Sequence, residues 1–517
     1  MKKVICLATI GLIMCACNQS NHKTAENDRK EKLPNIVYIL ADDMGYGDVS
    51  VNNPESKIST PHIDQLAAEG MRFTDAHAPS SVCTPSRYGI LTGRYCWRSR
   101  LPQGVLQGYG RALIEKDQLT IGTFLQQYDY ETAVIGKWHL GLNWVIKNGY
   151  DSVLQINEND QDHARIIQNI DDKYIDITKP VTDGPREHGF DYSYILPASL
   201  DMPPYCYLQN DSLTAPLNGY TQGNEVHPKD APNYAIGAFW RPGLMATGFD
   251  FSEVLPNFTD HAVNYIQQHS QADKSFFLYF AMPAPHTPWL PSKEFAGKSK
   301  AGEYGDYVMM VDAMVGKVLD AIKKNGLSDN TLIIFASDNG PYWRPNFVEK
   351  YDHRAAYIFR GMKADAWEGG HRIPFIVKWN GKIKAGSVSH LTTTLTNLIA
   401  TCSELINGEE TVASAIDSYS ILPVLLGNKD STAIPQTIVN ESSHGLFAVR
   451  KGPWKLIKGR GSGGFSAPVT YEPKPGEAKG QLYDLEKDSS ETNNLYLKDS
   501  KKVSELNLLI DSIIQLK

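Results

Sequence analysis

The sequence predicts an α/β protein built on one large, mixed, mostly parallel β-sheet sandwiched by helices, with a smaller C-terminal subdomain of antiparallel strands and a helix. Three observations support this prediction. Continuous apolar runs, typical of strands buried on both faces, recur along the first two thirds of the chain. Helical stretches separate these runs, which favours parallel pairing. Towards the C-terminus the pattern changes to short, closely spaced strand-like segments followed by a helix.

Buried strands are predicted over the ranges 35–41, 131–135, 275–282 and 331–337. Helices are predicted between them, over 61–70, 118–127, 258–269 and 304–325. Two polar pairs, Asp42-Asp43 and Asp338-Asn339, directly follow the first and last of these strands. Because ligands bind at the carboxyl ends of parallel strands, these pairs are the first candidates for chemistry.

The predicted main domain covers residues 34–430, and the C-terminal α+β subdomain covers residues 431–517. Within the first domain, residues 141–257 are rich in Gly, Pro, Asn and Tyr, so we expect an insertion that carries substrate loops rather than a separate domain. In the C-terminal subdomain, antiparallel strands are expected within 447–457 and 481–485, with a terminal helix from about Lys502.

The N-terminus has the pattern of a targeting segment. A basic start, an apolar stretch too short to span a bilayer and a lipobox-like run ending at Cys17 predict a lipoprotein signal peptide over residues 1–17. Lipid-modified Cys17 would then anchor the chain to a membrane through a flexible tether, residues 18–33. The expected location is the periplasm or the outer membrane of a Gram-negative bacterium. A plain cleaved signal peptide is the alternative.

Charge and cysteine content exclude some classes of protein. A formal net charge of −7 argues against nucleic acid as a partner, so an anionic substrate requires a local basic cluster. Of the seven cysteines, three lie in the targeting segment and one is Cys83. The remaining three, Cys96, Cys206 and Cys402, are an odd and widely spaced set that predicts no disulfide framework, although one bridge stays possible.

The segment Cys83-Thr-Pro-Ser-Arg-Tyr-Gly-Ile-Leu-Thr-Gly93 carries the strongest motif. It resembles the signature of the type I, formylglycine-dependent sulfatases, which belong to the alkaline-phosphatase-like superfamily. The resemblance implies that a formylglycine-generating or anaerobic sulfatase-maturing enzyme oxidises Cys83 to Cα-formylglycine, whose hydrate attacks sulfur. It further implies that Arg87 holds this group in place. A structural cysteine in a proline-containing turn is the alternative.

Asp42, Asp43, Asp338 and Asn339 offer carboxylate and amide oxygens, which favour calcium or magnesium over zinc. Each pair alone is also common in helix caps and turns. Together with Cys83 they match the sulfatase metal set, and this resemblance implies one Ca²⁺ ion per site, with Mg²⁺ as the less favoured choice.

Three further motifs resemble sulfatase positions. Lys137 and His139 are spaced by two, so in an extended chain they would point to one side. The resemblance places Lys137 on the sulfate and His139 near the nucleophile hydroxyl. His286, between two prolines, would be the general acid or a sulfate contact, and Lys363, before Glu-Gly-Gly, would complete the sulfate clamp.

Substrate recognition is expected in the loops beside these motifs. Asp201, His353 and Arg354 are the predicted substrate-binding residues, and aromatic residues could stack on a sugar. These stacking candidates are Tyr205, Trp240 and Trp343. The loops resemble those of bacterial glycan sulfatases, which implies exo-acting removal of an O-sulfate from galactose or N-acetylgalactosamine in a sulfated glycan, at the 6-position ahead of the 4-position. A phosphonate or phosphate monoester hydrolase and a non-enzymatic glycan-binding lipoprotein are the alternatives.

Overall fold

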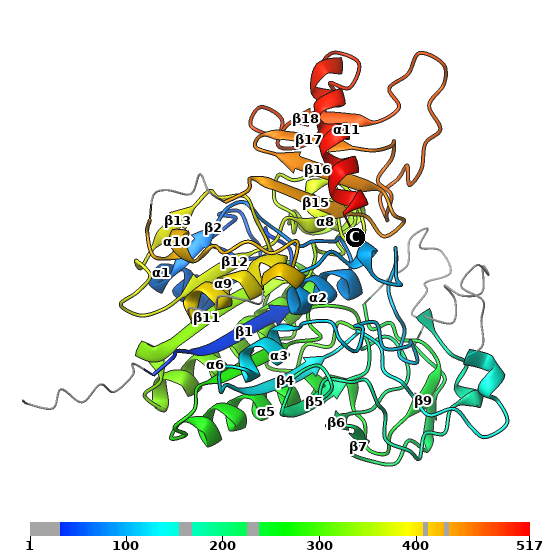
Figure 1. Ribbon diagram of the computed structural model, residues 1–517, viewed down its shortest axis with the longest axis vertical. Helices are drawn as coiled ribbons and strands as arrows, with labels where there is room; N and C mark the ends of the chain where they lie inside the picture. The colour runs from blue at the N-terminus through cyan, green and yellow to red at the C-terminus, as the bar shows by residue number, and fades with distance from the viewer. Residues whose placement is uncertain (1–31, 155–167, 225–236, 407–411, 429–433, 517) are drawn as a thin grey trace, which may run out of the picture. The chain divides into compact units, whose positions relative to one another are not determined.

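A ten-stranded sheet organises the chain from Leu33 onward (Figure 1). The structure is a computed structural model, and it describes residues 32–154, 168–224, 237–406, 412–428 and 434–516. The predicted signal peptide, the lipidation site Cys17 and nearly all of the tether lie outside these residues. In the described part of the chain, no helix combines the length and the apolar character needed to cross a membrane.

The order of the strands confirms the predicted mixed sheet. The five central strands, β11, β1, β10, β4 and β5, are all parallel, and antiparallel strands extend the sheet on both sides. From one edge to the other, the strands are β13 (Ser387–Ser389), β2 (Met71–Phe73), β12 (Phe375–Lys378), β11 (Thr331–Ser337), β1 (Asn35–Ala41), β10 (Phe276–Ala281), β4 (Glu131–Lys137), β5 (Tyr192–Leu196), β6 (Leu208–Gln209) and β7 (Ser212–Leu213).

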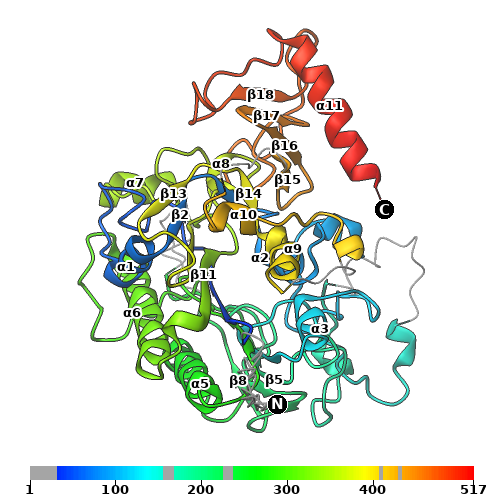
Figure 2. The same ribbon diagram turned by 60° about the vertical axis from the view of Figure 1, so that its left-hand side comes forward.

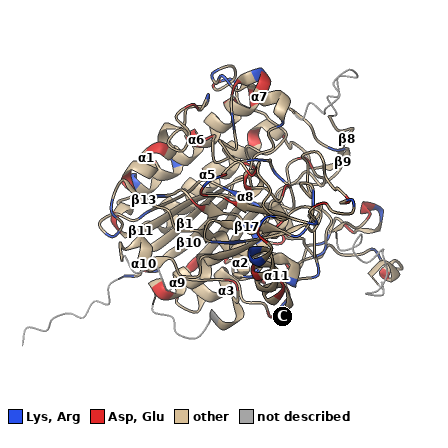
Figure 3. Cartoon of the chain, turned by 90° about the horizontal axis from the view of Figure 1, so that it is seen from above, with Lys and Arg blue, Asp and Glu red and all other residues tan. Residues whose placement is uncertain are grey.

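Helices cover both faces of the sheet (Figure 2). One face carries α1 (Pro61–Glu69), α5 (Val254–His269) and α6 (Gly302–Lys324), and the other carries α2 (Cys83–Thr92), α3 (Ile121–Gln126) and α9 (Leu398–Leu405). Because the central strands are buried on both faces, β1 and β10 contain no charged residue, whereas charges of both signs lie on outer helices such as α7 (Pro345–Tyr351), as Figure 3 shows.

A separate four-stranded antiparallel sheet forms the C-terminal subdomain. Its strands are β15 (Thr437–Glu441), β16 (Phe447–Lys451), β17 (Trp454–Ile457) and β18 (Gln481–Asp484), and α11 (Ser500–Gln515) packs against β16 and β17. Leu506 and Ile510 of α11 are fully buried in this small core. The antiparallel strands and the terminal helix are therefore confirmed. The predicted boundary at residue 430 falls in a stretch outside the described residues and stays a prediction.

The structure adds detail on residues 141–257 and on the cysteines. The insertion contributes β5, β6 and β7 to the main sheet, so it is part of the same core as well as a source of loops. The four cysteines in the described ranges are all free and buried, which excludes the disulfide that the sequence left open among them.

Candidate active site

The two predicted polar pairs meet at the carboxyl ends of neighbouring parallel strands. Ala41, the last residue of β1, lies beside Ser337, the last residue of β11, so the residues that follow are brought together. The Asp43 amide donates to Asp338 Oδ1 over 3.2 Å, and Asn339 Nδ2 donates to Asp43 Oδ1 over 2.7 Å. All four side chains of the pairs are buried.

Three basic side chains neutralise the buried carboxylates. Lys137 Nζ donates to Asp42 Oδ2 over 2.6 Å, and Lys363 Nζ lies 2.7 Å from Asp43 Oδ1. Arg87 binds Asp338 through Nε and Nη2 at 3.0 and 2.9 Å. These cations come from β4, from the loop before α8 (Glu368–His371) and from α2, so the site joins three elements far apart in sequence.

The carboxylates differ in their affinity for a proton. Burial opposes ionisation of Asp42, but the Lys137 ammonium, with His286 and Arg87, outweighs it and lowers the pKa of Asp42. Burial and the nearby Asp42 charge raise the pKa of Asp338 to about 7. Burial and repulsion between the carboxylates therefore still act on Asp338, although three cations lie beside the group.

The oxygen atoms of this group fit a hard divalent cation. Within the described residues, Asp42 Oδ1 and Asn339 Oδ1 are both buried without a hydrogen-bond partner. A buried unpaired oxygen costs free energy unless it has a ligand, and carboxylate and amide oxygens are ligands for calcium and magnesium. Four side chains also bring one possible ligand atom each to within 4.8 Å of one another, and these are Asp42, Asp43, Cys83 and His286.

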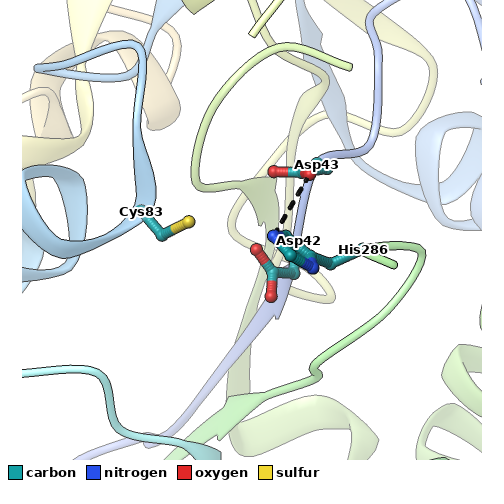
Figure 4. Close-up of side chains that lie close together, drawn as sticks. All are labelled: Asp42, Asp43, Cys83 and His286. Carbon is teal, nitrogen blue, oxygen red and sulfur yellow. Dashed lines mark ion pairs between the residues drawn. The ribbon is translucent and has the colours of Figure 1, made fainter. Parts of the chain in front are cut away.

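Cys83 is the first residue of α2 and faces this group. Figure 4 shows its sulfur pointing toward Asp42, Asp43 and His286. Lys363 Nζ lies 3.6 Å from Cys83 Sγ. Burial nevertheless raises the pKa of Cys83 to about 12, so the unmodified thiol stays protonated at neutral pH and is a poor nucleophile.

Two histidines complete the group. His286 lies with Nε2 3.7 Å from Asp43 Oδ2 and with Nδ1 3.3 Å from Ser199 Oγ. His139 Nε2 donates to the Leu106 carbonyl over 2.7 Å, which leaves Nδ1 as an acceptor, and this buried nitrogen has no partner in the described part of the chain. Burial lowers the pKa of His139 well below its ordinary value, so the ring is neutral.

A cavity of about 860 Å³ opens above these residues. Cys83, Asp43, His139, His286 and Lys363 contribute to its lining. The C-terminal subdomain contributes part of the wall, through the residues Ser443, His444, Gly464, Phe465 and Val469. The cavity is therefore shared between the main sheet domain and the C-terminal subdomain.

Asp201 is the predicted substrate residue that lines the cavity. Its side chain is buried and pairs with Arg241, also on the wall, while Oδ1 has no hydrogen-bond partner among the described residues. Burial opposes ionisation of Asp201, but His286 and Arg241 outweigh it and lower its pKa. The carboxylate therefore presents an acceptor beside His286.

Other predicted residues lie elsewhere. Arg87 and Lys137 are fully buried behind the carboxylates and are absent from the described lining. Lys137 donates to Asp42, and its contact with the sulfate stays a prediction. His353 was predicted to bind substrate, but it is buried and pairs with Asp48 over 2.7 Å. Arg354 is exposed and also does not line the cavity in the described structure.

The aromatic residues expected to stack on a sugar lie in the core or pack against it. Tyr205 and Trp343 are buried, and Trp240 stacks on Phe251 with the ring centroids 4.4 Å apart. The described cavity wall instead carries Phe239, Trp289, Tyr342 and Phe465. These residues, like Arg241 and Arg344 on the same wall, lie in loops without a periodic pattern, so no sequence signal marked them.

Comparisons with known proteins agree with this geometry. The family model described as Sulfatase matches residues 34–408. An N-acetylgalactosamine-6-O-sulfatase of Bacteroides thetaiotaomicron is 32% identical, with 97% of this chain and 96% of the relative covered. Arylsulfatase A of Bos taurus is 31% identical over 89% of this chain and 83% of its own length.

A solved structure from work on glycosaminoglycan metabolism by Bacteroides thetaiotaomicron superposes with a TM-score of 0.77 and 31% identity, covering 93% of this chain and 99% of that one. A sulfatase from Pseudoalteromonas sp., at 23% identity and a TM-score of 0.67 over 94% and 92% of the two chains, shares the fold. The resemblance drawn from the Cys83 signature is confirmed. The chain belongs to the sulfatase family and is a sulfuric ester hydrolase.

Proposed function

We propose that this sulfatase removes an O-sulfate from N-acetylgalactosamine or galactose at the end of a glycan, with the 6-position preferred to the 4-position. The observation that carries the proposal is the cavity above Cys83, whose lining combines Lys363 and His286 with the acceptor Asp201. Lys363 and His286 can bind the oxygens of a sulfate ester, and Asp201 can accept a hydrogen bond from a sugar hydroxyl. The relative named N-acetylgalactosamine-6-O-sulfatase, which this chain matches over nearly its whole length, supports the choice of sugar and position.

Each cavity residue then has a distinct role. Lys363 and His286 contact the sulfate oxygens, and His286 donates the proton that the sugar oxygen needs in order to leave. The neutral His139 accepts a proton from the nucleophile through Nδ1. Asp201 accepts a hydrogen bond from a sugar hydroxyl near the sulfate. Arg87 and Lys137 act as positioning residues, because they hold Asp338 and Asp42.

We infer that Cys83 is converted to formylglycine by a maturation enzyme. The high pKa of the buried thiol supports this, because the unmodified side chain would be a weak nucleophile at neutral pH. The hydrated aldehyde would supply a hydroxyl that attacks sulfur. Asp42, Asp43, Asp338 and Asn339, with the modified Cys83, would hold Ca²⁺, which would stabilise negative charge on the sulfate oxygens.

We further propose that the chain is exported and anchored by lipidated Cys17, facing the periplasm or the cell surface. The sequence pattern before Cys17 supports this. Metabolic labelling with a fatty acid analogue should mark the wild type and leave Cys17→Ala unmarked. Equal labelling of both proteins would contradict the anchor.

The substrate is tested with a panel of sugars that carry one sulfate at the 2-, 3-, 4- or 6-position, together with the phenyl monoesters of methylphosphonate and of phosphate. Release of sulfate from 6-sulfated N-acetylgalactosamine or galactose is expected to exceed release from the other isomers. Preference for a sulfated glucosamine or for the phosphonate would contradict the proposal. Because the clamp is common to all sulfates, the preference must come from contacts to neighbouring hydroxyls, and Asp201→Asn should reduce it.

Maturation is tested by mass spectrometry of the tryptic peptide from Phe73 to Arg87. In active protein this peptide should carry formylglycine in place of Cys83, and Cys83→Ala should be inactive but folded. Full activity of protein that contains only unmodified Cys83 would contradict the mechanism.

A further inference from the structure

The C-terminal subdomain fixes one wall of the cavity relative to the sulfate-binding lysine. The loop after β17 contains Phe465, whose amide donates to Asp365 Oδ1 over 2.7 Å. The Ser466 amide donates to the same oxygen over 3.0 Å. Asp365 lies two residues after Lys363, so the loop with Phe465 is tied directly to the segment that carries the lysine.

Three side chains on this part of the wall form a row. The Phe465 ring packs edge-to-face on the Tyr342 ring, with the centroids 5.6 Å apart. The Arg344 guanidinium lies over the Tyr342 ring at 5.2 Å. Phe465 is 48% exposed although it lines the cavity, so much of its surface is open to a ligand.

This row is not needed for cleavage of the sulfate ester itself. Lys363 lies 3.6 Å from Cys83 Sγ and provides positive charge for the sulfate, and His286 belongs to the same group of side chains. A further guanidinium and an exposed aromatic ring on the same wall suit a different part of the substrate. A sugar ring has an apolar face that packs on an aromatic ring, and a guanidinium pairs with a carboxylate or a sulfate.

The cavity also has room for more than the sulfated sugar. Its volume of about 860 Å³ lies near the upper end of the range for small-molecule sites. We propose that Phe465, Tyr342 and Arg344 form a subsite for a second, acidic sugar linked to the sulfated one. Phe465 stacks on the sugar face, and Arg344 binds its anionic group. This inference rests on the proposed function, because it adds a neighbour to the sugar that loses its sulfate.

The test compares three substrates with one sulfated N-acetylgalactosamine in common. The first is the 6-sulfated monosaccharide, the second links it to a uronic acid, and the third is the same disaccharide with the carboxyl group reduced to an alcohol. The wild type should show a kcat/KM about tenfold higher for the acidic disaccharide than for the reduced one, as expected for a hydrogen bond to a charged group. In a fourth substrate, a sulfate replaces the carboxylate of the second sugar. Comparing its kcat/KM with that of the acidic disaccharide shows whether Arg344 binds a carboxylate or a sulfate.

Two variants separate the contributions of the row. Arg344→Ala should lose about tenfold in kcat/KM on the acidic disaccharide alone. Arg344→Lys should restore part of this preference, because it keeps the charge. Phe465→Ala should lose activity on both disaccharides and keep it on the monosaccharide, and Phe465→Leu provides a second variant that preserves an apolar side chain. Lys350→Ala is the matched control, because it removes a positive charge from the adjacent helix α7 (Pro345–Tyr351) outside the described cavity lining.

The outcomes distinguish this inference from the proposed function. Equal losses of Arg344→Ala on all substrates, or equal rates of the wild type on the acidic and reduced disaccharides, would overturn the subsite and leave the proposed function standing. If the wild type cleaves none of the 6-sulfated substrates but cleaves another sulfated sugar, the proposed function and the subsite both fail.

Discussion

Glu441 should make the stability of this sulfatase fall as the pH rises. It is the last residue of β15, and its side chain is 2% exposed. Among the described residues, its Oε1 has no hydrogen-bond partner. Burial raises the pKa of Glu441 to about 9 from an ordinary value of 4.5. The same residue contacts the segment before Cys83, since its carbonyl accepts from the Ser81 amide over 3.0 Å.

The sign of the effect follows from the raised pKa. The folded state keeps a proton that the unfolded state releases, so this proton's contribution to stability is complete below pH 4.5 and is lost as the pH rises through about 9. The slope is about 1.4 kcal/mol per pH unit between these limits. Between about pH 5 and about pH 8 the contribution should therefore fall by about 4 kcal/mol. Glu441→Gln imitates the protonated form and should lack this dependence.

Urea unfolding of the wild type and of Glu441→Gln at several pH values measures the effect. Other groups titrate in both proteins, so the difference between their free energies of unfolding is the informative quantity. The wild type should become less stable relative to the variant as the pH rises. Glu55→Gln, at an exposed site, is the matched control. A difference that stays constant across this range would refute the idea that burial keeps the carboxyl group protonated.

Three further predictions concern the buried charges and the site. Lys455→Met removes the ammonium group that lies 3.0 Å from Glu368 and 2.9 Å from Glu491. Because both carboxylates are then buried without this partner, the free energy of unfolding, measured by urea titration at fixed pH, should fall by about 3–5 kcal/mol. Asn339→Ala removes a proposed calcium ligand and should lower kcat by about 100-fold or more, with a higher calcium concentration needed for half-maximal activity in a metal titration. His286→Ala should slow cleavage of a sugar sulfate more than that of nitrophenyl sulfate, because nitrophenolate leaves without a proton; equal losses in the two assays would restrict His286 to sulfate binding.

Sequence reasoning succeeded where local patterns follow directly from burial. β1 and β11 cover the predicted ranges 35–41 and 331–337, because strands covered on both faces must be continuously apolar. The polar residues after them could then be placed at one edge of the sheet. Cys83 begins α2, and Pro85 in the first turn of that helix suits this position.

The same reasoning failed where the backbone leaves regular geometry. Gly136 and His139 have φ values of 118° and 58°, so the chain is not extended from Lys137 to His139 and the alternation rule does not apply. Gly136 is required there, because a Cβ atom would lie 1.9 Å from the Ala281 carbonyl oxygen. Apart from Asp201, the cavity wall was also beyond local patterns, since Arg241, Arg344 and Phe465 come from loops that only the tertiary fold brings together.

The C-terminal subdomain is part of the active site, because it holds the segment that carries Lys363. Glu368, five residues further along, binds Lys455 of β17 at 3.0 Å, and Arg450 of β16 at 3.5 Å. Arg450 also binds Asp75, which precedes the Cys83 loop, at 2.6 Å. Buried ion pairs add little net stability, since desolvation offsets most of their attraction. Their consequence here is geometric: they fix the lysine and the nucleophile loop relative to one another, and they orient the wall that contains the proposed second sugar subsite.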